Sequence, residues 1–239
     1  MSDVPRYGMV IDLDRCTGCR ACMESCKVEN NTPEATFWMY VFRFEEGEYP
    51  DTRVRFMPRP CMHCDNAPCV KVCPVGARYK REDGLVATDW ERCIGCRYCE
   101  VACPYGVNTF NWTHPEEQYY LGWEDGAPPW ANPDLNEPYG DERRRIAGGG
   151  RDEGVIEKCT FCVQRVEQGL DPACVHGCPL KALVFGDLDD PESPPSRLLR
   201  KKEAFRLLEE VGTEPRVHYV GGGPPSENSK QIDAVEARV

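Results

Sequence analysis

Sixteen cysteines are the residues of this 239-residue sequence that are best suited to chemistry, because a thiolate can bind a metal, attack a substrate or pair with a second thiol. They fall into four groups of four. The first and third groups read C-x2-C-x2-C-x3-C, the second C-x2-C-x4-C-x3-C, and the fourth C-x2-C-x11-C-x3-C. In chain order the groups are Cys16, Cys19, Cys22 and Cys26; Cys61, Cys64, Cys69 and Cys73; Cys93, Cys96, Cys99 and Cys103; and Cys159, Cys162, Cys174 and Cys178.

This spacing favours iron–sulfur clusters. The run C-x2-C-x2-C-x3-C followed by proline is typical of two-cluster bacterial ferredoxins, in which the fourth cysteine binds the neighbouring cluster. Proline follows three of the four final cysteines, as Pro74, Pro104 and Pro179. Zinc ribbons use C-x2-C pairs without a third cysteine and a proline, and disulfide frameworks are typical of short secreted chains. A structural zinc-binding interaction module is the remote alternative.

The spacing also predicts how the clusters share the cysteines. The second and third groups are only 19 residues apart, from Pro74 to Arg92, which suits one two-cluster module, and the first and fourth groups then form another. Three cysteines from one group and one from its partner group give four ligand sets. They are set 1, Cys16, Cys19, Cys22 and Cys178; set 2, Cys26, Cys159, Cys162 and Cys174; set 3, Cys61, Cys64, Cys69 and Cys103; and set 4, Cys73, Cys93, Cys96 and Cys99.

Internal repeats indicate the elements that position these cysteines. Residues 11–20 resemble residues 88–97, and residues 68–74 resemble residues 173–179, with the cysteines in register. Each repeat predicts a short strand, a glycine-containing cluster loop and a short helix, and such small elements bury so little apolar area that we expect the clusters to act as cores. The predicted fold class is α+β: two nested bacterial-ferredoxin-like modules, loop-rich and built around four [4Fe–4S] clusters. The strands are expected at Met9–Leu13, Leu85–Ala87 and Ala182–Phe185.

The predicted domains follow from this nesting. Residues 1–60 plus 151–192 form the outer module, 61–110 the inner module, 111–150 an insert and 193–239 a C-terminal helix and tail. The insert is rich in proline and glycine and carries Trp112, Trp123, Trp130 and Tyr139. We give equal weight to a partner-docking insert and to a surface flap that packs on its own protein.

The C-terminal residues predict one helix and a loose end. Ser196 is expected to cap a helix that runs to Val211 and ends at Gly212. Beyond Gly221 the composition is typical of a tail that is loose or ordered by a partner.

Composition excludes several other classes of protein. The formal net charge of −11 excludes a nucleic-acid binder, which needs a basic face. No apolar run approaches the ~20 residues of a membrane-spanning helix, and residues 1–14 lack the pattern of a secretory signal, so we expect neither. No Ser-His-Asp combination, phosphate loop or open metal site is visible, and we expect the chain to be no enzyme by itself.

Other side chains near the cysteines have more than one interpretation. His63 and His176 lie in cluster loops, but sixteen cysteines already supply four ligands to each of four clusters, so we expect hydrogen bonding or plain exposure. Arginines beside cysteines either raise cluster potentials or are simply solvated, and we weigh these interpretations equally. These arginines are Arg15, Arg20, Arg92 and Arg97.

Three longer motifs resemble a known family. They are CMHCDNAPC at residues 61–69, EKCTFC at residues 157–162 and GDLDDP at residues 186–191. The sequence resembles, over nearly all of residues 7–192, the four-cluster electron-transfer (beta) subunits of molybdopterin oxidoreductases of the dimethyl sulfoxide reductase type. These include the iron–sulfur subunits of polysulfide, tetrathionate, arsenate and dimethyl sulfoxide reductases. Some relatives lack one cysteine of the third group and hold a [3Fe–4S] centre, whereas the complete third group here implies four [4Fe–4S] clusters.

The resemblance implies a role in anaerobic respiration. The chain is expected to relay single electrons between a large molybdopterin (bis-guanine dinucleotide) catalytic subunit and an integral membrane quinone or quinol subunit. It is then a peripheral membrane protein within a complex, on a side of the membrane that its partner determines. The alternative of the same class is the electron-transfer subunit of a hydrogenase or formate dehydrogenase.

Overall fold

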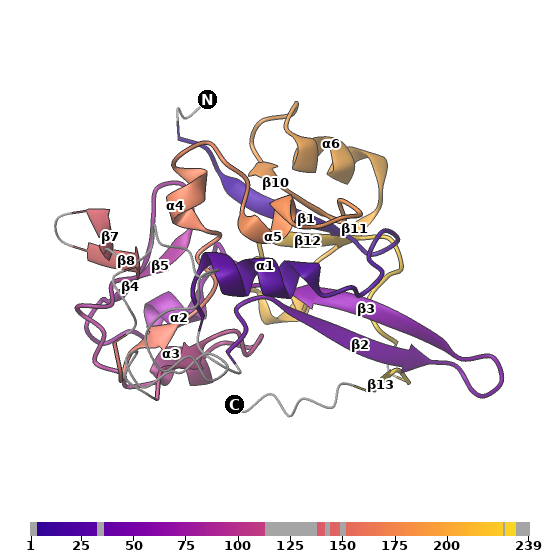
Figure 1. The fold of residues 1–239 in the computed structure, drawn as a ribbon, viewed down its shortest axis with the longest axis horizontal. Helices are drawn as coiled ribbons and strands as arrows, with labels where there is room; N and C mark the ends of the chain where they lie inside the picture. Colours follow the sequence, from indigo (N-terminus) through magenta and orange to yellow (C-terminus); the bar gives the residue numbers. More distant parts are fainter. Residues whose placement is uncertain are drawn as a thin grey trace.

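The computed structural model describes residues 4–32, 36–112, 138–141, 144–148, 152–226 and 228–232. Figure 1 shows small helices and strands joined by long loops, as expected for a loop-rich α+β fold. None of the helices in these residues is long and apolar enough to span a bilayer. The α-helices are α1 (Ala21–Glu29), α2 (Pro68–Lys71), α3 (Tyr98–Val101), α4 (Val163–Val166), α5 (Ala173–His176) and α6 (Pro194–Lys201).

A four-stranded sheet joins the two ends of the chain. Its order is β10 (Leu183–Asp187), β1 (Tyr7–Asp12), β12 (Val217–Val220) and β11 (Ala204–Phe205). Strand β1 is antiparallel to β10 and parallel to β12. Both faces of β1 are covered, since Met9, Val10 and Ile11 are all fully buried. This explains why its sequence is continuously apolar rather than alternating.

A second sheet is a long hairpin that projects from the body of the molecule (Figure 1). Strands β2 (Tyr40–Glu46) and β3 (Arg53–Arg59) pair antiparallel, and β13 (Lys230–Gln231) adds to β2. Alternate positions of β2 place aromatic rings on one face, with Tyr40 and Phe42 centroids 4.8 Å apart. The Arg59 guanidinium lies 4.5 Å from the centre of the Phe42 ring and covers it.

The described residues also form three two-stranded sheets, and their helices pack in pairs that follow the repeat. Helix α1 packs against α5, and α2 packs against α3, so equivalent parts of the duplicated unit form equivalent contacts. The small sheets pair β4 (Arg78–Lys80) with β5 (Val86–Thr88), β6 (Thr109–Phe110) with β9 (Ile156–Glu157), and β7 (Pro138–Asp141) with β8 (Arg144–Gly148).

The C-terminal helix differs from its prediction. Helix α6 covers Pro194–Lys201, and the hydroxyl of Ser193, not of Ser196, accepts the capping hydrogen bond from the Ser196 amide. The predicted helix to Val211 is therefore wrong in both bounds. Residues 204–205 form a strand instead, 209–211 form a short 3-10 helix, and 217–220 form β12. The three strands predicted at the repeats are present as β1, β5 and β10, shifted by one or two residues.

The insert is described only in part. Trp123 and Trp130 lie outside the described residues, so the docking prediction made for them stays a prediction. Within the described part, Tyr139 lies on β7 and its hydroxyl donates a hydrogen bond to Glu167.

The hydrophobic core combines cysteines with ordinary apolar side chains. Buried Met9, Met39, Leu85 and Tyr219 belong to one continuous cluster. The same cluster contains buried cysteines from sets 1, 2 and 3, and half-buried cysteines pack against it, so the chain supplies a core of its own around the thiols. The buried ones are Cys22, Cys26, Cys61, Cys64, Cys159, Cys174 and Cys178, and the half-buried ones are Cys16, Cys69, Cys93 and Cys103.

Candidate metal centres

The loops of the first and third cysteine groups have matching backbones. Gly18 and Gly95 have φ of +69° and +66°, and Arg20 and Arg97, which precede α1 and α3, have φ of +63° and +60°. These left-handed residues let each loop curl and present three thiols to its concave side. The repeat seen in the sequence is thus a repeat of conformation.

Three of the four predicted sets each line one hollow. The hollows enclose about 320 Å³ at set 1, 330 Å³ at set 3 and 330 Å³ at set 4 of space outside protein atoms, including their mouths. Each hollow is reached by thiols from two separate stretches of chain, as Cys178 joins set 1, Cys103 joins set 3 and Cys73 joins set 4. Four thiols around a common hollow are the donor set that a [4Fe–4S] cluster requires.

The set 2 thiols are all buried, and they influence one another electrostatically. Burial raises the pKa of Cys26 well above its ordinary value, and Cys162 and Cys159 raise it further. The pKa of Cys174 is raised in the same way by burial and then by Cys162, Cys26 and Cys159. The structure thus brings these four thiols together.

The sets are arranged in series. Sets 1 and 2 share helix α1, which carries both Cys22 and Cys26, and His63 in the set 3 loop contacts the carbonyl of Cys159 in set 2. Arg78 acts on thiols of both set 3 and set 4. The order along the molecule is therefore set 1, set 2, set 3, set 4. Among the sixteen cysteines, all of which are described, the exposed ones are in the end sets, as Cys19 and Cys96.

The raised pKa values test whether a cluster fits these thiols. Burial raises the pKa of Cys22, Cys64 and Cys159 to about 12, so without a positive partner they hold their protons at neutral pH. A cationic iron–sulfur core supplies that positive charge and displaces the protons. Within the described residues, no three His, Cys, Asp or Glu side chains converge on a single-ion site, and the thiols surround hollows instead.

Backbone amides point at several of the sulfurs. The Arg78 amide donates to Cys73 Sγ at 3.4 Å, and the Ala182 amide donates to Cys178 Sγ at 3.3 Å. These two cysteines are equivalent in the repeat, since each is the final cysteine of its group. Such donors offset the negative charge of a bound cluster and stabilise its reduced form.

The two histidines in cluster loops behave as predicted. His63 is fully buried, accepts a hydrogen bond from the Val86 amide at Nδ1 (3.0 Å), and donates from Nε2 to the Cys159 carbonyl (3.1 Å). Burial lowers its pKa far below the ordinary value, so the ring is neutral and ties set 3 to set 2. His176 is exposed. Neither is in a position that replaces a cysteine ligand.

Sequence reasoning missed three buried polar side chains beside the sulfurs. Asn30 Nδ2 lies 3.6 Å from Cys26 Sγ and 3.5 Å from Cys162 Sγ. Arg78 Nη2 donates to Cys99 Sγ at 3.4 Å, and Lys158 lines the set 3 hollow. Only Asn30 and Lys158 gave a signal, since each is near a cysteine in sequence.

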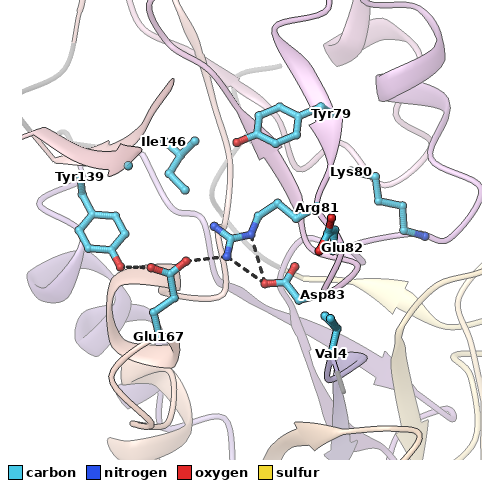
Figure 2. Close-up of a pocket in the computed structure, with 10 residues that line it drawn as sticks. Val4, Tyr79, Lys80, Arg81, Glu82, Asp83, Tyr139, Ile146 and Glu167 are labelled. Atoms are coloured by element: carbon cyan, nitrogen blue, oxygen red, sulfur yellow. Dashed lines mark hydrogen bonds and ion pairs between the residues drawn. The ribbon is translucent and has the colours of Figure 1, made fainter. Parts of the chain in front are cut away.

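A further hollow lies away from the cysteines, and Figure 2 shows its walls. Arg81 reaches across it, with Nη2 3.0 Å from Asp83 Oδ2 and 2.5 Å from Glu167 Oε1. Tyr139 donates to the same Glu167, which with burial raises the pKa of Tyr139 to about 12. Arg81 directly follows β4 and Glu167 directly follows α4, so these contacts tie the ends of β4 and α4 to Tyr139 on β7.

Comparison with known proteins agrees with this donor set. Two family profiles, each described as "4Fe-4S dicluster domain", match residues 52–118 with 145–188 and residues 15–77. The two dicluster matches and the sixteen cysteines support four [4Fe–4S] clusters.

Several curated relatives are iron–sulfur subunits of reductases. The chain is 44% identical over 229 residues to the iron-sulfur subunit of a putative dimethyl sulfoxide reductase of Halobacterium salinarum, covering 90% of this chain and 79% of that one. It is 42% identical to the arsenate respiratory reductase iron-sulfur subunit of Shewanella sp. (strain ANA-3), covering 90% and 96%. It is 40% identical to the menaquinone reductase iron-sulfur cluster-binding subunit of Nitratidesulfovibrio vulgaris, covering 90% and 88%. The chain therefore belongs to the 4Fe-4S dicluster family, among the iron–sulfur electron-transfer subunits of reductases.

Proposed function

We propose that this chain relays single electrons between a molybdopterin catalytic subunit and an integral membrane subunit that reacts with quinone. When bound, the four clusters supply one-electron transfer. The observation that carries the proposal is the serial order of the thiol sets, with the exposed Cys19 at one end and the exposed Cys96 at the other. A chain with accessible ends and a buried middle is suited to pass electrons between two docked proteins.

The ligands proposed for each cluster are the four sets predicted from the spacing. The hollows shared by sets 1, 3 and 4 and the mutual influence of the set 2 thiols support this assignment. Sets 1 and 2 then form an outer ferredoxin-like module, and sets 3 and 4 form an inner one nested within it. The chain has no catalytic role of its own in this proposal, and it associates peripherally with the membrane through its partners.

The surface beside set 4 suits the membrane subunit better than the surface beside set 1. Exposed apolar side chains gather near set 4, where Val101 is 81% exposed, Trp112 66% and Ile94 63%. Val75 and Tyr98 are exposed in the same part of the chain. A face with this many exposed apolar groups is typical of a docking surface. Arginines line both hollows, Arg15 and Arg20 at set 1 and Arg97 at set 4, but the exposed large apolar residue that lines the set 1 hollow is Leu180, 44% exposed.

A Val101→Glu substitution tests this function. We expect the variant to keep its clusters and the catalytic subunit but to lose the membrane subunit, because a charge at the centre of an apolar interface must be desolvated. Complexes purified from membranes would be resolved by subunit composition and by cluster reduction with quinol.

Val54→Glu is the matched control, since Val54 is an exposed valine on β3, far from the set 4 loop in sequence. It should leave both partners bound. A wild-type chain that purifies without a molybdopterin subunit, or with a hydrogenase or formate dehydrogenase subunit, contradicts the proposed function itself. Equal loss of the membrane subunit in both valine variants contradicts only the docking face.

A further inference from the structure

A buried arginine lies between the set 3 and set 4 thiols. Arg78 is the first residue of β4 and only 2% exposed. Its amide donates to Cys73 Sγ, and its guanidinium Nη2 donates to Cys99 Sγ, each at 3.4 Å. Both sulfurs border the set 4 hollow, and Arg78 itself lines that hollow.

The rest of this guanidinium has no protein partner among the described residues. Arg78 Nε and Nη1 are buried and donate no hydrogen bond to any of them, and no described carboxylate pairs with Arg78. An arginine remains protonated under all ordinary conditions, and an unpaired buried charge is costly. The negative charge that compensates Arg78 is therefore expected on the thiolates and on what they hold.

The field of Arg78 reaches two sets. Burial raises the pKa of Cys69 to about 11 and raises that of Cys99, while Arg78 opposes the increase at both thiols. Cys69 belongs to set 3 and Cys99 to set 4. Arg78 thus stabilises negative charge in both the set 3 hollow and the set 4 hollow.

Further cations are found on the same side. Lys158 is also 2% exposed, lines the set 3 hollow, and donates from Nζ to the Cys159 carbonyl at 2.9 Å. The half-buried Arg59 lies near Cys103 of set 3. Burial lowers the pKa of Arg59, and Cys103 is among the groups that oppose this decrease.

Sets 1 and 2 have a different environment. The neutral side chain of Asn30 contacts two set 2 sulfurs. At Cys162 burial raises the pKa, the Glu29 carboxylate raises it further, and Arg165 opposes that increase. At set 1 the charged residues of the rim are Arg15, which is exposed, and Arg20. Buried Arg78 acts on thiols of sets 3 and 4, whereas buried Lys158 acts on Cys69 of set 3 and on Cys159 of set 2.

We propose that Arg78 is a potential-setting residue, which raises the reduction potentials of the clusters held by sets 4 and 3 above those of sets 1 and 2. Reduction adds one negative charge to a cluster, and a fixed cation in a buried site stabilises that charge more than a solvated one does. An electron delivered to the chain then resides on the clusters of sets 3 and 4, in the inner module. This inference rests on the proposed function and its ligand sets.

The test is an anaerobic redox titration of the isolated holoprotein, followed by EPR. In Arg78→Gln we expect the equilibrium constant for reduction of the set 4 cluster to fall at least tenfold, about 59 mV for a one-electron couple. The set 3 cluster should shift in the same direction by less, and the set 1 and set 2 clusters should not shift. A Cys96→Ser variant identifies the set 4 signal, because Cys96 belongs to set 4 alone.

Arg92→Gln is the matched control. It makes the same substitution beside Cys93 of the same set, but the Arg92 side chain is 58% exposed and lies 3.4 Å from Asp89. Solvent screens such a charge, so its removal should leave the set 4 potential nearly unchanged. Arg78→Lys keeps the charge and should retain most of the wild-type potential.

Two outcomes overturn the proposal. One is a shift in Arg78→Gln no larger than in Arg92→Gln. The other applies even if Arg78→Gln fails to assemble: a wild-type protein in which the set 4 cluster is reduced at lower potential than the set 1 cluster. Intact EPR signals with unshifted potentials contradict only the role of Arg78, whereas the absence of iron and of all four signals contradicts the proposed function.

Discussion

At the scale of single residues, the cysteines act in sets that cross the chain. Cys26 lies four residues after Cys22 in sequence, yet the thiols with which it interacts most strongly are Cys162 and Cys159. Helix α1 explains this, because Cys22 and Cys26 lie on the same face but Cys26 is one turn, about 6 Å, further along the helix axis and so reaches the next set. The last cysteine of each group thus links two clusters, and its loss should be felt at the second one.

We expect Cys26→Ser to damage the cluster of set 2 and to leave that of set 1 intact. The serine hydroxyl is a poorer iron ligand than a thiolate, and Asn30 then loses one of its two sulfur contacts. EPR of the dithionite-reduced variant would show the change. Loss of the set 1 signal with the set 2 signal retained would refute the predicted sharing.

A histidine away from the clusters gives a pH-dependent prediction. His218 on β12 is mostly buried, and burial followed by Arg206 lowers its pKa from 6.5 to about 4. As pH falls below 6.5 the unfolded chain binds this proton first, so the stabilisation is full above pH 6.5 and is lost progressively down to pH 4.

His218→Gln should remove this dependence. Between pH 7.5 and 5.5 the wild type is expected to lose on the order of 1 kcal/mol more stability than the variant. Anaerobic denaturant unfolding of both holoproteins at the two pH values would measure the difference. Parallel losses in the two proteins would show that His218 does not titrate in this way.

At the scale of elements, local motifs were predictable and long-range pairing was not. The cluster loops and the strands beside them follow from cysteine, glycine and proline positions a few residues apart. Helix α6 was predicted too long because residues 204–205 form β11 instead, which pairs with β12; β12 in turn lies parallel to β1, about 200 residues earlier in the chain, and such pairing leaves no periodic signal. The contact of Arg78 with Cys99 could not be predicted for the same reason, since the two residues are far apart in sequence and meet only in the folded chain.

Gly95→Ala should disrupt one cluster loop. Gly95 has φ of +66°, and a Cβ there would lie 2.0 Å from the Gly154 carbonyl oxygen, a backbone atom that cannot move aside. We expect the variant to lose the set 4 cluster, measured as about a quarter of the iron and the loss of one EPR signal.

Gly76→Ala provides the control for backbone strain. Its φ is similar, +64°, but no atom lies within 4 Å of the added Cβ. It should cost only about 1 kcal/mol and retain all four clusters. Equal cluster loss in both variants would mean that the left-handed backbone, rather than contact with Gly154, decides assembly.

At the scale of the whole molecule, the four-stranded sheet and the part around sets 3 and 4 differ in how stable we expect them to be without clusters. The four-stranded sheet contains fully buried Met9, Val10, Ile11, Val217 and Tyr219. Among the described residues, the part around sets 3 and 4 has the four-residue helices α2 and α3, the three-residue pairing of β4 with β5 and the two-residue pairing of β6 with β9. Helices and sheets of that size are not stable alone.

Iron removal should therefore unfold most of the chain, beginning with the part around sets 3 and 4. Without clusters, the thiols line empty hollows and the unpaired Arg78 remains buried, which together disfavour the native packing. After chelation under reducing conditions, far-UV circular dichroism should lose most of its signal. Hydrogen exchange at β4 and β5 should approach the rate of an unfolded chain, while β1 and β12 retain the most protection. A cooperative melt with an unchanged spectrum in the iron-free protein would show that the polypeptide core is sufficient for folding. The clusters would then bind to a fold that forms without them.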